Sequence, residues 1–174
     1  PDRQVVFFAI GFETTTPSTA VAILEAAALG LGNFSVLCCH VLTPPAMTAI
    51  LEASASAGGV PLDGFVGPAH VSTIIGSAPY AFCAERYGKP VVIAGFEPLD
   101  VMQAILMLIR QTNEGRAEVE NEFVRAVSHE GNRKAQALVA EVFTLRPDFE
   151  WRGLGTLPHS PPGLAPAHRG LAAA

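Results

Sequence analysis

Apolar runs that alternate with longer helical segments constrain the fold of this chain more than any other feature. Four runs, at residues 5–10, 34–41, 64–67 and 90–94, have the length and composition of buried strands. A segment with helical periodicity follows each of them. Because helical crossovers return the chain to the same edge with the same handedness, this order predicts a parallel β-sheet.

Two helix starts carry the same dipeptide. Thr16-Pro17 and Thr43-Pro44 each place a capping residue before a proline, which is favoured in the first helical turn. A further helix is predicted from residue 99 to about residue 113. We therefore expect the α/β class, with a parallel sheet of about four to five strands and helices on both of its faces.

The character of the sequence changes in its last third. We expect one α/β domain over residues 1–152, made of a core at 4–115 and a small α+β extension at 116–152. Residues 153–174 are rich in proline, glycine and alanine, which is typical of a linker or a disordered tail.

Charge and composition exclude several classes of function. The net charge is −5, with 11 basic and 16 acidic residues, and the basic residues are scattered, so no surface for nucleic acid or an anionic membrane is expected. The apolar runs are too short to span a bilayer. Three cysteines fit a reducing compartment, and no leader precedes Pro1, so we expect a cytoplasmic segment of a longer protein.

Polar and titratable residues follow the predicted strands. They are Glu13, Thr14 and Thr15 after the first strand, His40 after the second, His70 after the third, and Glu97 and Asp100 after the fourth. The carboxyl ends of parallel strands meet at one edge, where open α/β sheets bind ligands. The sequence therefore predicts a polar, titratable cleft at this edge.

Each of these residues also has a simpler structural interpretation. Glu13 and Glu97 precede predicted helices, whose free N–H groups a carboxylate can cap. The threonines are common turn residues, and single histidines are often buried with their hydrogen bonds satisfied. Residue spacing alone leaves both interpretations open.

The cysteines do not predict a metal site in this chain. Cys38 and Cys39 are adjacent on a predicted strand, so their side chains point to opposite faces and do not readily share one metal. Cys83 lies within a predicted helix. We expect buried thiols and no metal ligand among the three.

Several longer segments resemble one family. They are Gly11-Phe12-Glu13-Thr14-Thr15, Pro68-Ala69-His70-Val71-Ser72, Gly95-Phe96-Glu97-Pro98-Leu99-Asp100 and Gly115-Arg116-Ala117-Glu118-Val119-Glu120-Asn121. In this order they resemble the HypD family of [NiFe]-hydrogenase maturation factors, over residues 2–163. The sequence has Ala69 where the family pattern has glycine, and His70 is retained.

The resemblance implies a role in metal-centre assembly. HypD and the small protein HypC form a scaffold for the Fe(CN)2CO group, and HypE delivers the cyanide. The family has two α/β domains facing a cleft and a part that carries a [4Fe–4S] cluster. Its essential cysteine motifs are absent from this sequence. The chain is therefore similar to the central part of the family, with no cofactor of its own expected.

The resemblance also implies roles for the residues of the predicted cleft. Thr14, Thr15 and His70 can donate hydrogen bonds to iron-bound cyanide, and Glu13, His70 and Glu97 can relay protons. His40 is expected to contact the ligands or to position groups that do. Asp100 is expected to order its loop or the first turn of the helix that follows.

Two other functions remain open. The chain could be a docking module for HypC or HypE with no role at the iron, or an independent small-molecule enzyme with Glu13 and His70 as acid and base. We expect the segment alone to be inactive, because in the family the full-length protein acts as a redox-active assembly scaffold.

Overall fold

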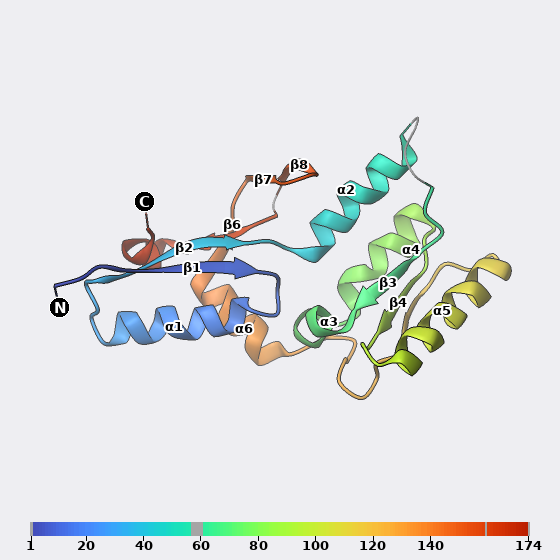
Figure 1. The fold of residues 1–174 in the computed structure, drawn as a ribbon, viewed down its shortest axis with the longest axis horizontal. Coiled ribbons are helices and arrows are strands. Elements are labelled where there is room, and N and C mark those ends of the chain that lie inside the picture. The colour runs from blue at the N-terminus through green and yellow to red at the C-terminus, as the bar shows by residue number, and fades with distance from the viewer. Residues whose placement is uncertain (1, 57–60, 159, 174) are drawn as a thin grey trace. The chain divides into compact units, whose positions relative to one another are not determined.

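The computed structural model describes residues 2–56, 61–158 and 160–173, and the chain forms two compact units (Figure 1). Unit 1 comprises residues 1–46 and 134–174, and unit 2 comprises residues 47–133. Both contain parallel strands and helices, so the predicted α/β class is confirmed. No described helix combines the length and the apolar character that a membrane-spanning segment requires.

Unit 1 contains a parallel pair of strands and two antiparallel pairs. Its elements are β1 (Val5–Gly11), α1 (Thr16–Ala28), β2 (Phe34–His40), the start of α2 (Thr43–Ala55), α6 (Arg133–Val142), β6 (Phe143–Leu145), β7 (Asp148–Trp151), β8 (Gly155–Pro158), β9 (Pro162–Leu164) and the 3-10 helix η2 (Pro166–Leu171). β1 pairs with β2 in parallel, whereas the β6–β9 and β7–β8 pairs are antiparallel. Buried Ala9, Ile23, Val36 and Val142 belong to its core.

The end of the chain is more ordered than the sequence predicts. Residues 153–174, predicted as a linker or disordered tail, contain β8, β9 and η2. The Ala173 N–H donates a hydrogen bond to the Val36 carbonyl of β2 at 2.9 Å. Composition was misleading here because these strands are only three or four residues long, and the partner strand supplies the hydrogen bonds that hold them.

Unit 2 contains a three-stranded parallel sheet. After the remainder of α2, its elements are β3 (Phe65–Pro68), α3 (Ala69–Ile75), the 3-10 helix η1 (Ala78–Tyr80), α4 (Ala81–Tyr87), β4 (Val91–Ala94), α5 (Pro98–Asn113) and β5 (Val119–Asn121). β4 is the central strand and is buried along its whole length. Val91 and Ile93 of β4 pack with Tyr80 and Cys83 in the core.

The prediction of a single sheet is wrong. β1 and β2 form one sheet, and β3 and β4 belong to a second, in which β5 pairs in parallel with β4. β5 is therefore part of the second sheet and not of a separate extension after residue 115. An apolar strand has the same sequence pattern in either sheet, so periodicity cannot reveal which strands are neighbours.

β1 also differs from the buried strand that its sequence predicts. Phe8 and Ile10 are each 57% exposed, and Ala9 is the only buried residue of the strand. β1 has one strand neighbour among the described residues, so its other edge has no strand partner among them. The strand itself was predicted correctly, but its burial was not.

Candidate functional site

The predicted site residues lie after strands as expected, but they are divided between the two units. Glu13, Thr14 and Thr15 follow β1 and His40 ends β2 in unit 1, whereas His70 follows β3, and Glu97 and Asp100 follow β4, in unit 2. The expectation of one shared sheet edge fails because these strands belong to two sheets. The structure thus gives two strand-end groups.

Glu13 is held by the first residue of α2. Its carboxylate accepts hydrogen bonds from the Thr43 backbone N–H at 2.8 Å and from the Thr43 hydroxyl at 2.9 Å. Glu13 is only 6% exposed. This burial raises the pKa of its carboxyl group, although the hydrogen bonds oppose the shift. Glu13 therefore caps a helix, but the helix is α2 and not the one that follows Glu13 in the sequence.

The three threonines of the same turn are not equivalent. The hydroxyls of Thr15 and Thr16 both donate to the Phe12 carbonyl, at 3.2 and 3.0 Å. The hydroxyl of Thr14 has no hydrogen-bond partner among the described residues, and Thr14 is partly exposed. Thr14 is therefore the threonine of this turn whose hydroxyl is available to a ligand.

His40 is enclosed. Its Nδ1 lies 3.5 Å from Cys38 Sγ, its Nε2 lies 3.5 Å from Thr19 Oγ1, and the edge of Phe143 faces the ring. The residue is fully buried, and burial lowers the pKa of His40 below 6.5. This geometry favours the interpretation of a neutral core histidine over a ligand contact.

A pH dependence of stability follows from His40. Because the pKa of His40 is lower in the folded state, His40 binds a proton near pH 6.5 in the unfolded chain but not in the folded chain. We expect the free energy of unfolding contributed by His40 to fall as the pH drops from 7.5 to 5.5. Urea titrations at both pH values should show a smaller loss in His40→Gln, which does not titrate. An equal loss in both proteins would contradict this.

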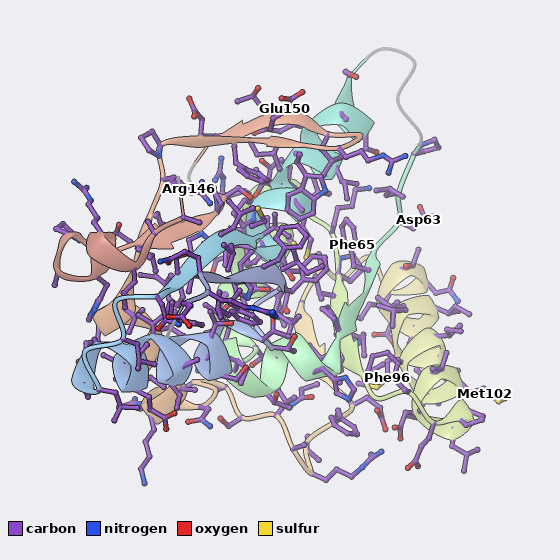
Figure 2. The ribbon with its side chains drawn as sticks, turned by 60° about the vertical axis from the view of Figure 1, so that its left-hand side comes forward. Asp63, Phe65, Phe96, Met102, Arg146 and Glu150 are labelled. Atoms are coloured by element: carbon purple, nitrogen blue, oxygen red, sulfur yellow. The ribbon has the colours of Figure 1, made fainter. Side chains whose placement is uncertain are left out.

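The unit 2 group has an exposed imidazole. The ring of His70, on α3, lies 4.6 Å from the ring of Phe96, and both residues are exposed (Figure 2 labels Phe96). Glu97 precedes α5, but its side chain makes no capping hydrogen bond and is 79% exposed. The capping interpretation of Glu97 is therefore not supported, and its carboxylate lies 3.7 Å from Arg125.

Asp100, at the start of α5, forms an ion pair with Arg125. Its carboxylate pairs with the Arg125 guanidinium at 2.5 Å, and this hydrogen bond lowers the pKa of Asp100. Gly95 lies so close that a Cβ there would overlap the Asp100 carboxylate and come within 2.7 Å of the Phe123 ring. The loop-ordering role of Asp100 stays a prediction, and its ion pair with Arg125 is the contact through which it would act. Sequence reasoning missed Arg125, because it lies in a turn where neither periodicity nor a motif marks it.

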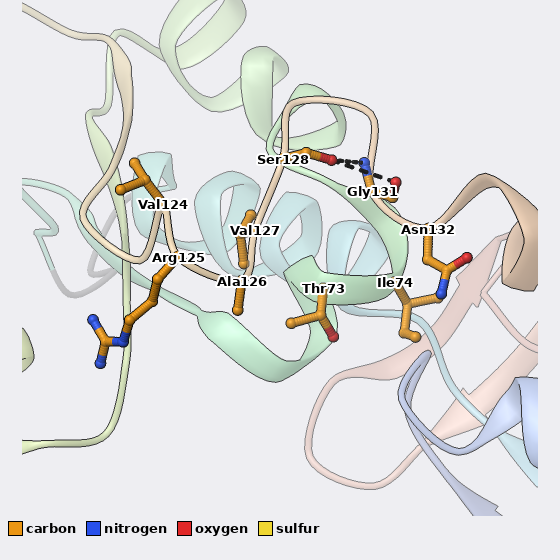
Figure 3. A pocket seen from close by; sticks show the side chains of 9 residues that line it. All are labelled: Thr73, Ile74, Val124, Arg125, Ala126, Val127, Ser128, Gly131 and Asn132. Atoms are coloured by element: carbon orange, nitrogen blue, oxygen red, sulfur yellow. Dashed lines mark hydrogen bonds between the residues drawn. The ribbon is translucent and has the colours of Figure 1, made fainter.

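A cavity of about 460 Å³ adjoins this group (Figure 3). Thr73, Arg125 and Ser128 line it, and the Thr73 hydroxyl donates to the His70 carbonyl at 2.6 Å. The Gly131 N–H donates to the Ser128 hydroxyl at 3.0 Å, which closes the turn that forms one wall. No periodic signal predicted this cavity, because an irregular segment builds much of it.

The cysteines do not fit an iron–sulfur cluster. Cys38 and Cys83 are buried in the cores of different units, and Cys39 points to the opposite face of β2 from Cys38. Among the described residues, no group of three or more His, Cys, Asp or Glu side chains could hold a metal ion.

Comparison with known proteins identifies the family. The family model described as HypD, "Hydrogenase formation hypA family", matches residues 1–174. The chain belongs to the HypD family. The segments after β1, β3 and β4, which contribute to the two strand-end groups, are among those that resemble this family in sequence.

Curated relatives of the family are similar over nearly the whole chain. The hydrogenase maturation factor HypD of Cupriavidus necator is 70% identical over 162 residues, 92% of this chain and 43% of the relative. The proteins of the same name from Rhizobium leguminosarum and Escherichia coli are 62% and 41% identical, each over 97% of this chain and 44% of the relative. The chain thus spans less than half the length of these relatives.

Proposed function

We propose that the chain is the central part of a hydrogenase maturation scaffold whose strand-end residues handle the ligands of an Fe(CN)2CO precursor. The proposal rests on two hydrogen-bond donors that are available to a ligand. The Thr14 hydroxyl has no partner among the described residues, and the His70 imidazole is exposed. Both follow strands within segments that resemble the family's motifs.

The chemistry of the precursor fits such donors. Iron-bound cyanide keeps a nitrogen lone pair that accepts hydrogen bonds, so a hydroxyl and an imidazole N–H can fix it without binding the metal. In this proposal the iron–cyanide group is the cargo of the full-length protein in complex with HypC, and HypE delivers the cyanide. Release of cyanide from a thiol-bound carrier needs electrons, which other parts of the full-length protein supply, together with protons. Candidates for the proton transfers are Glu13, whose pKa is raised by burial, His70 and Glu97.

The test requires the full-length protein. Thr14→Val and His70→Ala change positions at strand ends that are not buried in a core, so the fold is expected to survive. Hydrogenase maturation should fall about 10- to 100-fold, as is typical when groups that orient metal ligands are removed. The Fe–CN bands in the infrared spectrum of the complex with HypC should weaken in parallel.

Thr14→Ser is the matched control, because it keeps the hydroxyl and should retain most of the maturation activity. Circular dichroism and cluster content should be unchanged in all the variants. Wild-type maturation and unaltered Fe–CN bands in both Thr14→Val and His70→Ala would remove these residues from ligand handling.

A second candidate function is docking of HypC or HypE, and the surface of α5 favours it. Apolar side chains are exposed at helical spacing along this helix and just before it, at Phe96, Leu99, Met102, Leu106 and Ile109. Figure 2 shows Met102 extending away from the α5 ribbon. Exposed apolar stripes of this kind are typical of interaction surfaces.

The two functions are separable by one substitution. Met102→Lys should leave folding intact, because the side chain is exposed, and should weaken capture of HypC or HypE if α5 is the docking surface. Thr14→Val should not affect capture. Normal capture by Met102→Lys and by a second variant, Leu99→Lys, would contradict docking through α5.

A further inference from the structure

A cavity in unit 1, distinct from the strand-end group, contains two arginines. It has a volume of about 340 Å³ and is lined by residues of β2, β6, β9 and η2 and of the segments next to them. Arg146 and Arg169 contribute the charge, and Val36 and Leu164 contribute apolar surface. Cavities of this size with few polar groups are typical of small-molecule sites.

The lining of this cavity carries positive charge and no carboxylate. No acidic residue lines the cavity, although the sequence has 16 acidic and only 11 basic residues. Arg116, Arg125 and Arg133 each pair with a carboxylate. Neither Arg146 nor Arg169 has an acidic partner within the part of the chain that the structure describes. Among the described residues, no carboxylate compensates the positive charge of this cavity.

Arg146 is fixed by groups that do not neutralise it. Its Nη2 donates to the carbonyl of Cys38 at 2.5 Å and lies 3.4 Å from that of Pro162, and its guanidinium carbon lies 5.5 Å from the centre of the Phe149 ring. A Cβ at residue 163 would lie 2.8 Å from Arg146 Cγ, so Gly163 gives the side chain its room. The guanidinium is thus held in place before any ligand arrives, which lowers the entropic cost of binding.

Arg146 also retains unused hydrogen-bond donors. Its Nε is buried without an acceptor, and its Nη1 makes no hydrogen bond to any residue that the structure describes. Nη1 is therefore the donor of Arg146 that is left for an anion, and a hydrogen bond from a guanidinium to a carboxylate is stronger than one between neutral groups. Figure 2 labels Arg146 in this region of unit 1.

We propose that this cavity binds a small organic anion, a short-chain carboxylate whose oxygens pair with Arg146 and Arg169 and whose alkyl group contacts Val36 and Leu164. Carboxylates match a guanidinium in both charge and geometry. The apolar walls favour an alkyl carboxylate over inorganic phosphate. The inference does not depend on the proposed handling of iron ligands, which concerns the strand-end groups.

Titration of the purified protein with isobutyrate tests the proposal. At constant ionic strength, backbone amide signals of cavity residues such as Cys38 and Thr144 should shift in 15N–1H spectra and saturate. Isobutyramide, which has the same shape without the charge, should produce no saturable shift. Equal shifts with isobutyramide or with sodium chloride alone would overturn the proposal, and tighter binding of phosphate would overturn the choice of a carboxylate.

Three variants locate the binding. Arg146→Gln should weaken isobutyrate at least about tenfold, since hydrogen bonds to charged groups contribute strongly. Arg146 also supports the backbone, so Arg146→Gln could fail to fold. Arg169 is exposed, so Arg169→Gln should fold, and it should weaken binding severalfold. Arg152→Gln, an exposed arginine outside the lining, is the matched control and should bind normally. Unchanged affinity in Arg169→Gln would refute the paired-arginine site.

Discussion

Replacing Gly76 with alanine is expected to destabilise the protein by about 3 kcal/mol or more, because two penalties combine. Gly76 has φ 81° and ψ −175°, a region that is essentially confined to glycine. Its Cβ would also come within 2.6 Å of the Gly131 nitrogen and would overlap the His129 carbonyl oxygen. These are backbone atoms, so they cannot move away as the end of a flexible side chain could.

Gly88→Ala is the matched control in the same unit. Gly88 has φ 61°, but nothing lies within 4 Å of the position that a Cβ would take. Its substitution should cost only the left-handed strain, about 1 kcal/mol. Urea denaturation of both variants therefore isolates the effect of crowding. Equal midpoints for the two variants would show that the Gly76–Gly131 contact is not tight in solution.

Replacing Thr43 with valine should cost about 1–3 kcal/mol, because it leaves an oxygen of the buried Glu13 carboxylate without a donor. The hydroxyl of Thr43 donates to one oxygen of Glu13, and the backbone N–H of Thr43 donates to the other. Valine has nearly the same shape as threonine and retains only the backbone donor. Thermal or urea unfolding measures the loss, and Thr43→Ser should retain most of the stability.

The deficit of Thr43→Val should depend on pH in a defined direction. Burial raises the pKa of Glu13 above 4.5, and in the wild-type protein the hydrogen bond from the Thr43 hydroxyl opposes this shift. Thr43→Val removes that hydroxyl, so the pKa of Glu13 should rise further in the variant. At low pH Glu13 is protonated in both folded proteins, and the deficit is smallest. The deficit should grow as the pH rises from the wild-type pKa to that of the variant. A deficit that is constant between pH 4 and 8 would contradict a buried, titrating Glu13.

Local signals in the sequence predicted the elements well, whereas pairing between strands could not be predicted. The apolar runs at 5–10 and 90–94 correspond to β1 and β4, and Thr16 and Thr43 begin α1 and α2. Both runs were expected to be buried in one sheet, yet β4 is buried and β1 is largely exposed. Burial depends on which elements cover a strand, and that information lies in distant residues.

The candidate site shows the same division. Glu13, Thr14 and His70 were predicted from their positions after strands, and the structure has them there. Their roles differ because of contacts with residues that are distant in the sequence, such as the contact of Glu13 with Thr43. Arg125 and Arg146 were missed, since each acts from an irregular segment in which neither periodicity nor a motif marks it.

The exposure of β1 affects how the isolated chain must be handled. Its sequence, Val5 to Gly11, has no charge and no proline, and its outer edge has no strand partner among the described residues. Such an edge can recruit a strand from another molecule and so begin ordered aggregation. The charged residues Asp2 and Arg3 precede this strand, so they oppose aggregation only at the N-terminal end of β1. Concentrated solutions of the chain are therefore expected to lose soluble protein over time through β-sheet growth, without prior unfolding of either unit.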